Sequence, residues 1–215
     1  FDDSYPEIDK EQKSFVYGAS SVTDKVYKEL GVAGGVFAHT NEISLKPFFE
    51  ETPTLMWNTP IFMGQFKDFK INNEAIFIRP LIDSKWLAGT VMEVDEFNEW
   101  TEKLKKIDFD FSEQIFVSQL NQPESEYRLF FVNGNFSTGS QYKKNFELYK
   151  NRFVPDYIIQ KAENFVFENK HNLPKSFVVD VGQKEDKIGI IEVNGINNAG
   201  FYDIDKEKLM LDLMK

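Results

Sequence analysis

The chain has 215 residues, of which 41% are hydrophobic, and a formal net charge of −10. This acidic balance argues against nucleic-acid binding, which normally shows as a basic patch. The absence of Cys excludes disulfides and cysteine nucleophiles, and only His39 and His171 are present, which argues against a multi-histidine metal site. No apolar run approaches the ~18 residues of a membrane helix, and the first residues do not form a signal peptide. We therefore expect a cytoplasmic protein without membrane contact.

The beginning of the chain predicts a strand–helix–strand unit. Strands are expected at residues 14–17 and 35–38, and a helix at 20–30 that ends at Gly31. This alternation is typical of a small α/β lobe. We therefore predict an N-terminal α/β lobe over residues 1–65 and a second region over residues 66–215.

The second region combines short strands with amphipathic helices. Strands are predicted at residues 75–80, 90–92 and 115–120, and an amphipathic helix at 95–106 with Asp95 as its expected N-cap. Asn133-Gly134 is the strongest hairpin signal in the chain and joins the strands at 127–132 and 136–140. A further helix is predicted from Pro155 to about residue 170.

Three oxygen-bearing side chains lie within the last two predicted strands: Asp180 at 177–182, and Glu192 and Asn194 at 188–194. A strand interior is a poor place for an acid unless something pairs with it. The polar run 183–187 can close the strands into a hairpin. If Asp180 then lies near Ile190, it is a diagonal neighbour of Glu192 at about 7–8 Å. Two carboxylates and an amide oxygen on one face predict a Mg²⁺ site.

Basic residues that suit phosphate lie earlier in the chain. Arg79 ends an apolar strand and needs a partner, and Lys85 lies in a polar loop. Glu126 and Arg128 point to one strand face, and a guanidinium binds phosphate oxygens in pairs. Simpler readings remain open: Arg79 and Lys85 can reach solvent, and Glu126 with Arg128 can form a surface ion pair.

The order of these residues resembles the ATP-grasp superfamily. Asp180 followed by 192–194 and 197–202 resembles that family's metal-binding end. Residues 77–80 resemble the strand whose basic residue contacts the phosphates, and 126–129 the strand whose Arg faces the phosphoryl-transfer centre. The resemblance covers about residues 14–210. It implies an α+β ATP-grasp fold, in which two lobes with antiparallel sheets clasp the nucleotide.

The run from Arg79-Pro80 through Asp83-Ser84-Lys85 to Gly89, together with Glu126–Arg128, is most similar to a small clade found often in phages and their hosts. The resemblance implies a role for each candidate. Asp180, Glu192 and Asn194 would bind Mg²⁺ that bridges the ATP phosphates. The nucleotide contacts would come from Arg79, Lys85, Ser118, Gln119, Leu120 and Glu126. Arg128 would stabilise charge during transfer, while Asn197 and Asn198 would orient the acceptor or the phosphates; both can equally be turn residues.

The resemblance implies an ATP- and Mg²⁺-dependent carboxylate–amine ligase that acts through an acyl phosphate. Its partners would be ATP and an unknown carboxylate and amine acceptor, which could be a small molecule, a peptide or a protein. One alternative is a nucleotide-binding module without turnover, which regulates or binds a partner; the single Gly of the phosphate loop and the short first lobe favour it. Another is a phosphotransferase that acts on a hydroxyl group.

Overall fold

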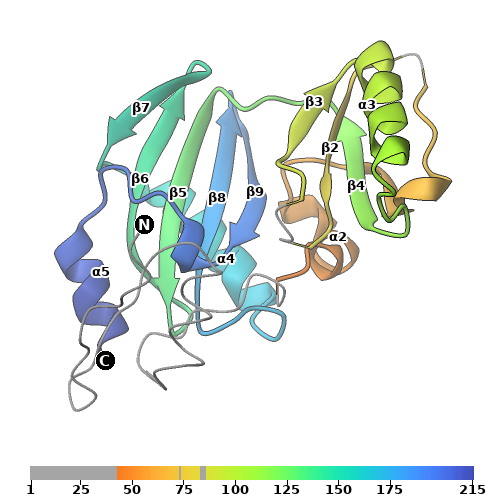
Figure 1. Ribbon diagram of the computed structural model, residues 1–215. Coiled ribbons are helices and arrows are strands. Elements are labelled where there is room, and N and C mark those ends of the chain that lie inside the picture. The colour runs from red at the N-terminus through yellow and green to blue at the C-terminus, as the bar shows by residue number, and fades with distance from the viewer. Residues whose placement is uncertain (1–42, 73, 83–85) are drawn as a thin grey trace, which may run out of the picture.

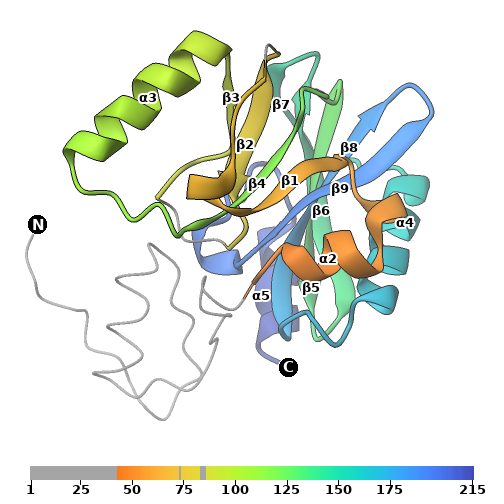
Figure 2. The same ribbon diagram turned by 90° about the vertical axis from the view of Figure 1, so that its right-hand side faces the viewer.

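The computed structural model describes residues 43–72, 74–82 and 86–215. Within this part the chain forms two antiparallel sheets (Figure 1). The smaller sheet has the strand order β1-β4-β2-β3, and the larger has the order β7-β6-β5-β8-β9. The smaller sheet lies between helix α3 and the edge strand β9 of the larger sheet (Figures 1 and 2). The predicted α+β class is confirmed.

The elements have the following bounds in chain order. The first part contains α2 (Lys46–Glu51), η2 (Pro53–Leu55), β1 (Pro60–Gln65), η3 (Phe66–Asp68), β2 (Ile76–Pro80), β3 (Thr90–Met92), α3 (Val94–Lys106) and β4 (Gln114–Gln119). The second part contains β5 (Ser125–Val132), β6 (Asn135–Lys144), β7 (Glu147–Asn151), α4 (Asp156–Glu168), β8 (Ser176–Lys184), β9 (Lys187–Asn194), η4 (Ile196–Asn198) and α5 (Lys206–Leu213).

The smaller sheet packs one face against α3. Ile76 and Ile78 of β2 are buried there together with Phe97 of α3, because alternate residues of a strand share a face. Phe77 and Arg79 therefore point to the opposite face. The expected N-cap of α3 at residue 95 is wrong: the helix begins after Glu93, whose backbone N–H donates to the Glu96 carboxylate at 3.1 Å, as in a capping box.

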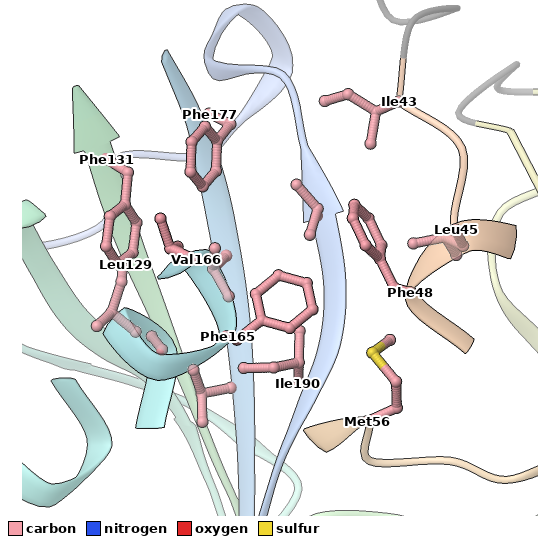
Figure 3. Packing of buried hydrophobic residues seen from close by; sticks show 14 of the residues in the cluster. Ile43, Leu45, Phe48, Met56, Leu129, Phe131, Phe165, Val166, Phe177 and Ile190 are labelled. Carbon is pink, nitrogen blue, oxygen red and sulfur yellow. The ribbon is translucent and has the colours of Figure 1, made fainter. Parts of the chain in front are cut away.

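The larger sheet buries one face against α4 (Figure 3). Phe131 of β5 stacks on Phe177 of β8 with ring centroids 5.4 Å apart, and Phe165 of α4 contacts Phe48 of α2 edge-on at 5.1 Å. On the opposite face, α5 covers one end of the sheet with a smaller cluster around Phe130. The rest of that face is available for polar side chains.

Most of the predicted elements between residues 75 and 194 are confirmed. The hairpin at Asn133-Gly134 has φ angles of 51° and 74°, as a two-residue turn with left-handed residues requires. The strands and helix predicted before residue 43 lie outside the described residues. β1 ends at Gln65 and pairs with β4, so the last six residues before the predicted boundary belong to the smaller sheet. The division at residue 65 stays a prediction. No helix of the described part is long and apolar enough to cross a membrane.

Candidate nucleotide and metal site

The larger sheet brings Arg128, Asp180 and Glu192 into one row across three neighbouring strands. Arg128 on β5 pairs with Asp180 on β8, and Asp180 pairs with Glu192 on β9. The expected register, with Asp180 near Ile190 and only diagonal to Glu192, is wrong because the ladder shifts between Asp180 and Val181. A bulge adds one residue to a strand. Here it places the two carboxylates directly opposite each other.

Arg128 and Asp180 form a buried ion pair with two hydrogen bonds. Nε of Arg128 donates to Oδ1 of Asp180 at 2.8 Å, and Nη2 donates to Oδ2 at 2.7 Å. The side chains are 11% and 1% exposed. The surface ion pair that the sequence left open for Arg128 is therefore wrong. Burial lowers the pKa of Arg128, but Asp180 outweighs it, and the pKa lies well above its ordinary value.

Arg79 reaches the same row from the smaller sheet. Its Nη1 donates to Oε2 of Glu192 at 2.5 Å, so an ion pair joins the two sheets. The side chains of Arg79 and Glu192 are 11% and 25% exposed, which rules out a strand-end Arg that simply reaches solvent. Nε of Arg79 is buried and has no hydrogen-bond partner. A guanidinium with an unsatisfied donor is suited to bind a further oxygen, such as that of a phosphate.

The donor set for a metal is two carboxylates and one amide. Asn194 lies beside Glu192 and donates from Nδ2 to Oε1 at 2.7 Å, so its amide oxygen points away from that carboxylate. Among the described residues no three His, Asp or Glu side chains gather into a metal cluster. Oxygen-only donors with few carboxylates nevertheless fit Mg²⁺, which is usually bound by one or two carboxylates plus substrate phosphates. The donor chemistry fits the predicted ion.

The charges of the row move the pKa values of its two acids in opposite directions. Burial raises the pKa of Glu192, but Arg79 and the hydrogen bond from Asn194 outweigh it and bring the pKa to about 2. Burial raises the pKa of Asp180 to about 6, because Arg128 offsets only part of the effect and the neighbouring carboxylate of Glu192 adds to it. Both carboxylates are therefore ionised at neutral pH.

Glu126 belongs to a second network next to this row. Its Oε1 accepts from Nζ of Lys143 at 2.7 Å, and its Oε2 accepts from the hydroxyl of Tyr142 at 2.5 Å. The same hydroxyl lies 3.3 Å from Oδ2 of Asp180. Burial and the carboxylates of Asp180 and Glu126 raise the pKa of Tyr142, so the hydroxyl remains a donor. Tyr142 thus connects Glu126 to the charged row.

Sequence reasoning missed Tyr142, Lys143 and Tyr202. The only local signal is the hairpin at Asn133-Gly134, which places 141–143 near the start of β5. Two register shifts in this hairpin then decide which residue faces Glu126, and no sequence pattern marks them.

A cavity of about 280 Å³ lies where the two sheets meet. Leu120 and the following residues of the β4–β5 connection line it, together with Phe77 of β2 and Glu126 of β5. The predicted hinge is therefore only partly placed here. Ser118 is fully buried inside β4 and does not line the cavity, nor does Gln119 at the end of that strand.

The remaining predicted site residues differ in what the structure describes. Asn197 is buried in η4, directly after the strand that carries Glu192 and Asn194. The side chain of Asn198 and the whole of Lys85 lie outside the described part. Their assigned roles stay predictions.

Two antiparallel sheets joined at a cavity, with paired carboxylates and guanidinium groups beside it, define a protein of the ATP-grasp class. The chain belongs to the ATP-grasp domain family, because the model of one clade of that family, the second that the clade comprises, matches residues 58–211. The predicted superfamily and clade type are confirmed, whereas the association with phages stays a prediction. A search of curated proteins finds no match.

Solved structures of ATP-grasp ligases have a similar fold. D-alanine–D-alanine ligase from Bacillus anthracis matches 79% of this chain and 63% of its own, with 11% identity and a TM-score of 0.55. The same enzyme complexed with ATP matches 81% and 62%, with 11% identity and a TM-score of 0.51. The ligase PsnB complexed with a minimal precursor matches 91% and 68%, with 10% identity and a TM-score of 0.51. The chain thus spans less than two thirds of the length of the first of these enzymes, and the likeness shows the fold.

Proposed function

We propose that this protein is an ATP- and Mg²⁺-dependent ligase that joins a carboxylate to an amine through an acyl phosphate. The observation that carries the proposal is the charged row Arg128–Asp180–Glu192, which Arg79 completes from the facing sheet. The row lies next to a cavity lined by the β4–β5 connection. Family membership supports nucleotide binding in this cavity.

The electrostatics of the site suit a bound metal–nucleotide complex. The two guanidinium groups and the two carboxylates sum to zero charge, and each is neutralised by a neighbour. A divalent cation held by Asp180, Glu192 and Asn194 would neutralise part of the triphosphate charge and polarise its oxygens. Arg79 and Arg128 would then be free to contact phosphate oxygens. Phosphoryl transfer depends mainly on this positioning and neutralisation.

The proposed chemistry has two steps. An oxygen of the acceptor carboxylate attacks the γ-phosphorus of ATP, the bond to the β–γ bridging oxygen breaks, and ADP leaves. The amine then attacks the acyl carbon of the acyl phosphate, the carbon–oxygen bond to phosphate breaks, and phosphate leaves while the nitrogen loses a proton to solvent. No protein nucleophile is required, which agrees with a chain that lacks Cys. Arg128 would stabilise the negative charge that moves in the first step.

The first test is ligand-dependent thermal stability of the whole chain with ATP, with Mg²⁺ and with both. A ligand that binds only the folded state stabilises it by about 2.7 kcal/mol at a hundredfold excess over its dissociation constant. We expect strong stabilisation only when ATP and Mg²⁺ are both present. Glu192→Gln should lose it, whereas the exposed control Glu163→Gln on α4 should retain it. Equal stabilisation of Glu192→Gln would contradict the metal assignment.

The second test is a screen for ADP release with pools of carboxylic acids and amines. Release that requires one acid and one amine together, with an amide as product, supports the ligase. A phosphorylated hydroxyl product would instead identify a phosphotransferase. Nucleotide binding without ADP release from any pool would favour the binding module, which the partial length relative to D-alanine–D-alanine ligase also suits.

A further inference from the structure

The guanidinium of Arg128 lies against two tyrosine rings. Its Cζ is 5.2 Å from the ring centroid of Tyr142 and 5.3 Å from that of Tyr202. The two rings are stacked on each other, with centroids 4.8 Å apart and an angle of 11° between their planes. A guanidinium within about 6 Å of an aromatic ring is attracted by its quadrupole. Arg128 is therefore held on one edge by Asp180 and against its side by a pair of rings.

The backbone of the 200–204 turn is arranged so that Tyr202 can take this place. Tyr202 has a φ of 47°, a left-handed conformation that bulky residues rarely adopt. A Cβ on Gly200 would lie 3.3 Å from Cζ of the Tyr202 ring, so a larger residue there would crowd the ring. Next to it, Phe201 packs on Phe130 of the sheet at 5.8 Å. Strained conformations persist where the surroundings enforce them and are concentrated at functional sites.

Tyr142 is fixed from the other side. It lies on β6 next to the register shift that faces Glu126, and its hydroxyl donates to that carboxylate. Its ring thus cannot turn without losing a hydrogen bond to a charged group. The hydrogen bonds of Arg128 use Nε and Nη2, so Nη1 is the nitrogen left without a partner among the described residues.

We propose that Tyr142 and Tyr202 are positioning residues that fix the plane of the Arg128 guanidinium and so direct Nη1 at the phosphoryl group that is transferred. The inference rests on the proposed function, because it requires ATP in the adjoining cavity. The rings contribute through Arg128 and do not touch the nucleotide. Their loss therefore weakens the preference for a nucleotide that carries the γ-phosphate and leaves the binding of the diphosphate unchanged.

The experiment measures the dissociation constants of Mg·ATP and Mg·ADP by isothermal titration calorimetry on the full chain. Tyr202→Leu removes the ring, and Tyr202→Phe retains it. Tyr149→Leu is the matched control, because Tyr149 also lies against a cation, Lys144 at 5.4 Å, but on the edge strand β7. Urea unfolding of each variant reports whether the fold is intact. Since Tyr202 is only partly buried, Tyr202→Leu is expected to fold.

We expect Tyr202→Leu to weaken Mg·ATP binding about tenfold, with Mg·ADP binding within twofold of the wild type. Tyr202→Phe should restore the ATP preference, and Tyr149→Leu should not change it. Equal ATP preference in Tyr202→Leu and the wild type would overturn the positioning role, as would a parallel loss of both affinities. Wild-type protein that binds neither nucleotide would overturn the proposed function itself. Wild-type binding without the ring effect would overturn only this inference.

Discussion

The buried ion pair of Arg128 and Asp180 makes a direct prediction about stability. Asp180→Asn keeps the shape of the side chain but removes the charge that compensates Arg128. Asp180 is 1% exposed and Arg128 11%, so water cannot replace the lost partner. Removing one partner of such a pair costs about 3–5 kcal/mol. That is a large share of the about 5–15 kcal/mol by which folded proteins are usually stable.

The assay is urea unfolding followed by the fluorescence of Trp57, Trp86 and Trp100. With a dependence of about 2 kcal/mol per M, a loss of 4 kcal/mol lowers the midpoint by about 2 M. The double variant Arg128→Met with Asp180→Leu is the control, because replacing a buried pair by apolar residues is often neutral or stabilising. We therefore expect the double variant to be more stable than Asp180→Asn.

Two results would refute this reasoning. One is an Asp180→Asn variant that unfolds within about 0.5 kcal/mol of the wild type, which is the range of ordinary surface substitutions. The other is a double variant that is less stable than Asp180→Asn. In that case the loss would come from packing around the pair and not from the uncompensated charge.

Three further predictions concern other parts of the fold. Gly189→Ala places a Cβ 2.7 Å from Cα of Trp57, so the cavity-lining segment must shift, and weaker Mg·ATP binding by calorimetry should follow with little change in urea midpoint. The pKa of Asp212 is held well below its usual range, first by the hydrogen bond from Lys208. Its contribution, about 0.5–1 kcal/mol, is thus present at neutral pH and lost as pH falls below the unfolded value of 3.8, and urea unfolding should show Asp212→Asn less stable than wild type at pH 7 but not at pH 2. Phe165→Ala should lower the unfolding free energy by about 3–5 kcal/mol, because the ring is fully buried.

The sequence predicted the residue types of the site well because they break local rules. An acid inside a strand, as at Asp180 or Glu192, has no reason to be there unless a partner exists. The same argument applied to Arg79 at the end of an apolar strand. In each case the structure supplies a charged partner, and the partner of Arg79 is 113 residues away in sequence. Composition within a strand thus reveals that a partner exists, but only the tertiary fold determines which residue it is.

Register is what the sequence could not supply. The turn at Asn133-Gly134 sets the pairing of β5 with β6, and an unbroken ladder from Val132 opposite Asn135 would place Arg128 opposite Gly139. A shift between Phe130 and Phe131 moves it by one residue, and a second shift follows at Glu126. One residue of slip exchanges the two faces of a strand. The bulges therefore decide which side chains meet, and their cost and benefit depend on contacts from other strands.

The structure also separates two carboxylates that the sequence treats alike. Both oxygens of Asp180 accept hydrogen bonds from Arg128, and the group is almost fully buried, so its substitution tests stability as much as metal binding. Glu192 is 25% exposed, and its partners are Arg79 from the other sheet and the amide of Asn194, which can rotate. A bound cation can replace these partners without leaving a buried charge alone, provided that Arg79 gains a phosphate oxygen at the same time. Mg²⁺ and ATP should therefore bind more tightly together than either does alone, and Glu192→Gln is the substitution that removes this coupling while the buried pair stays intact.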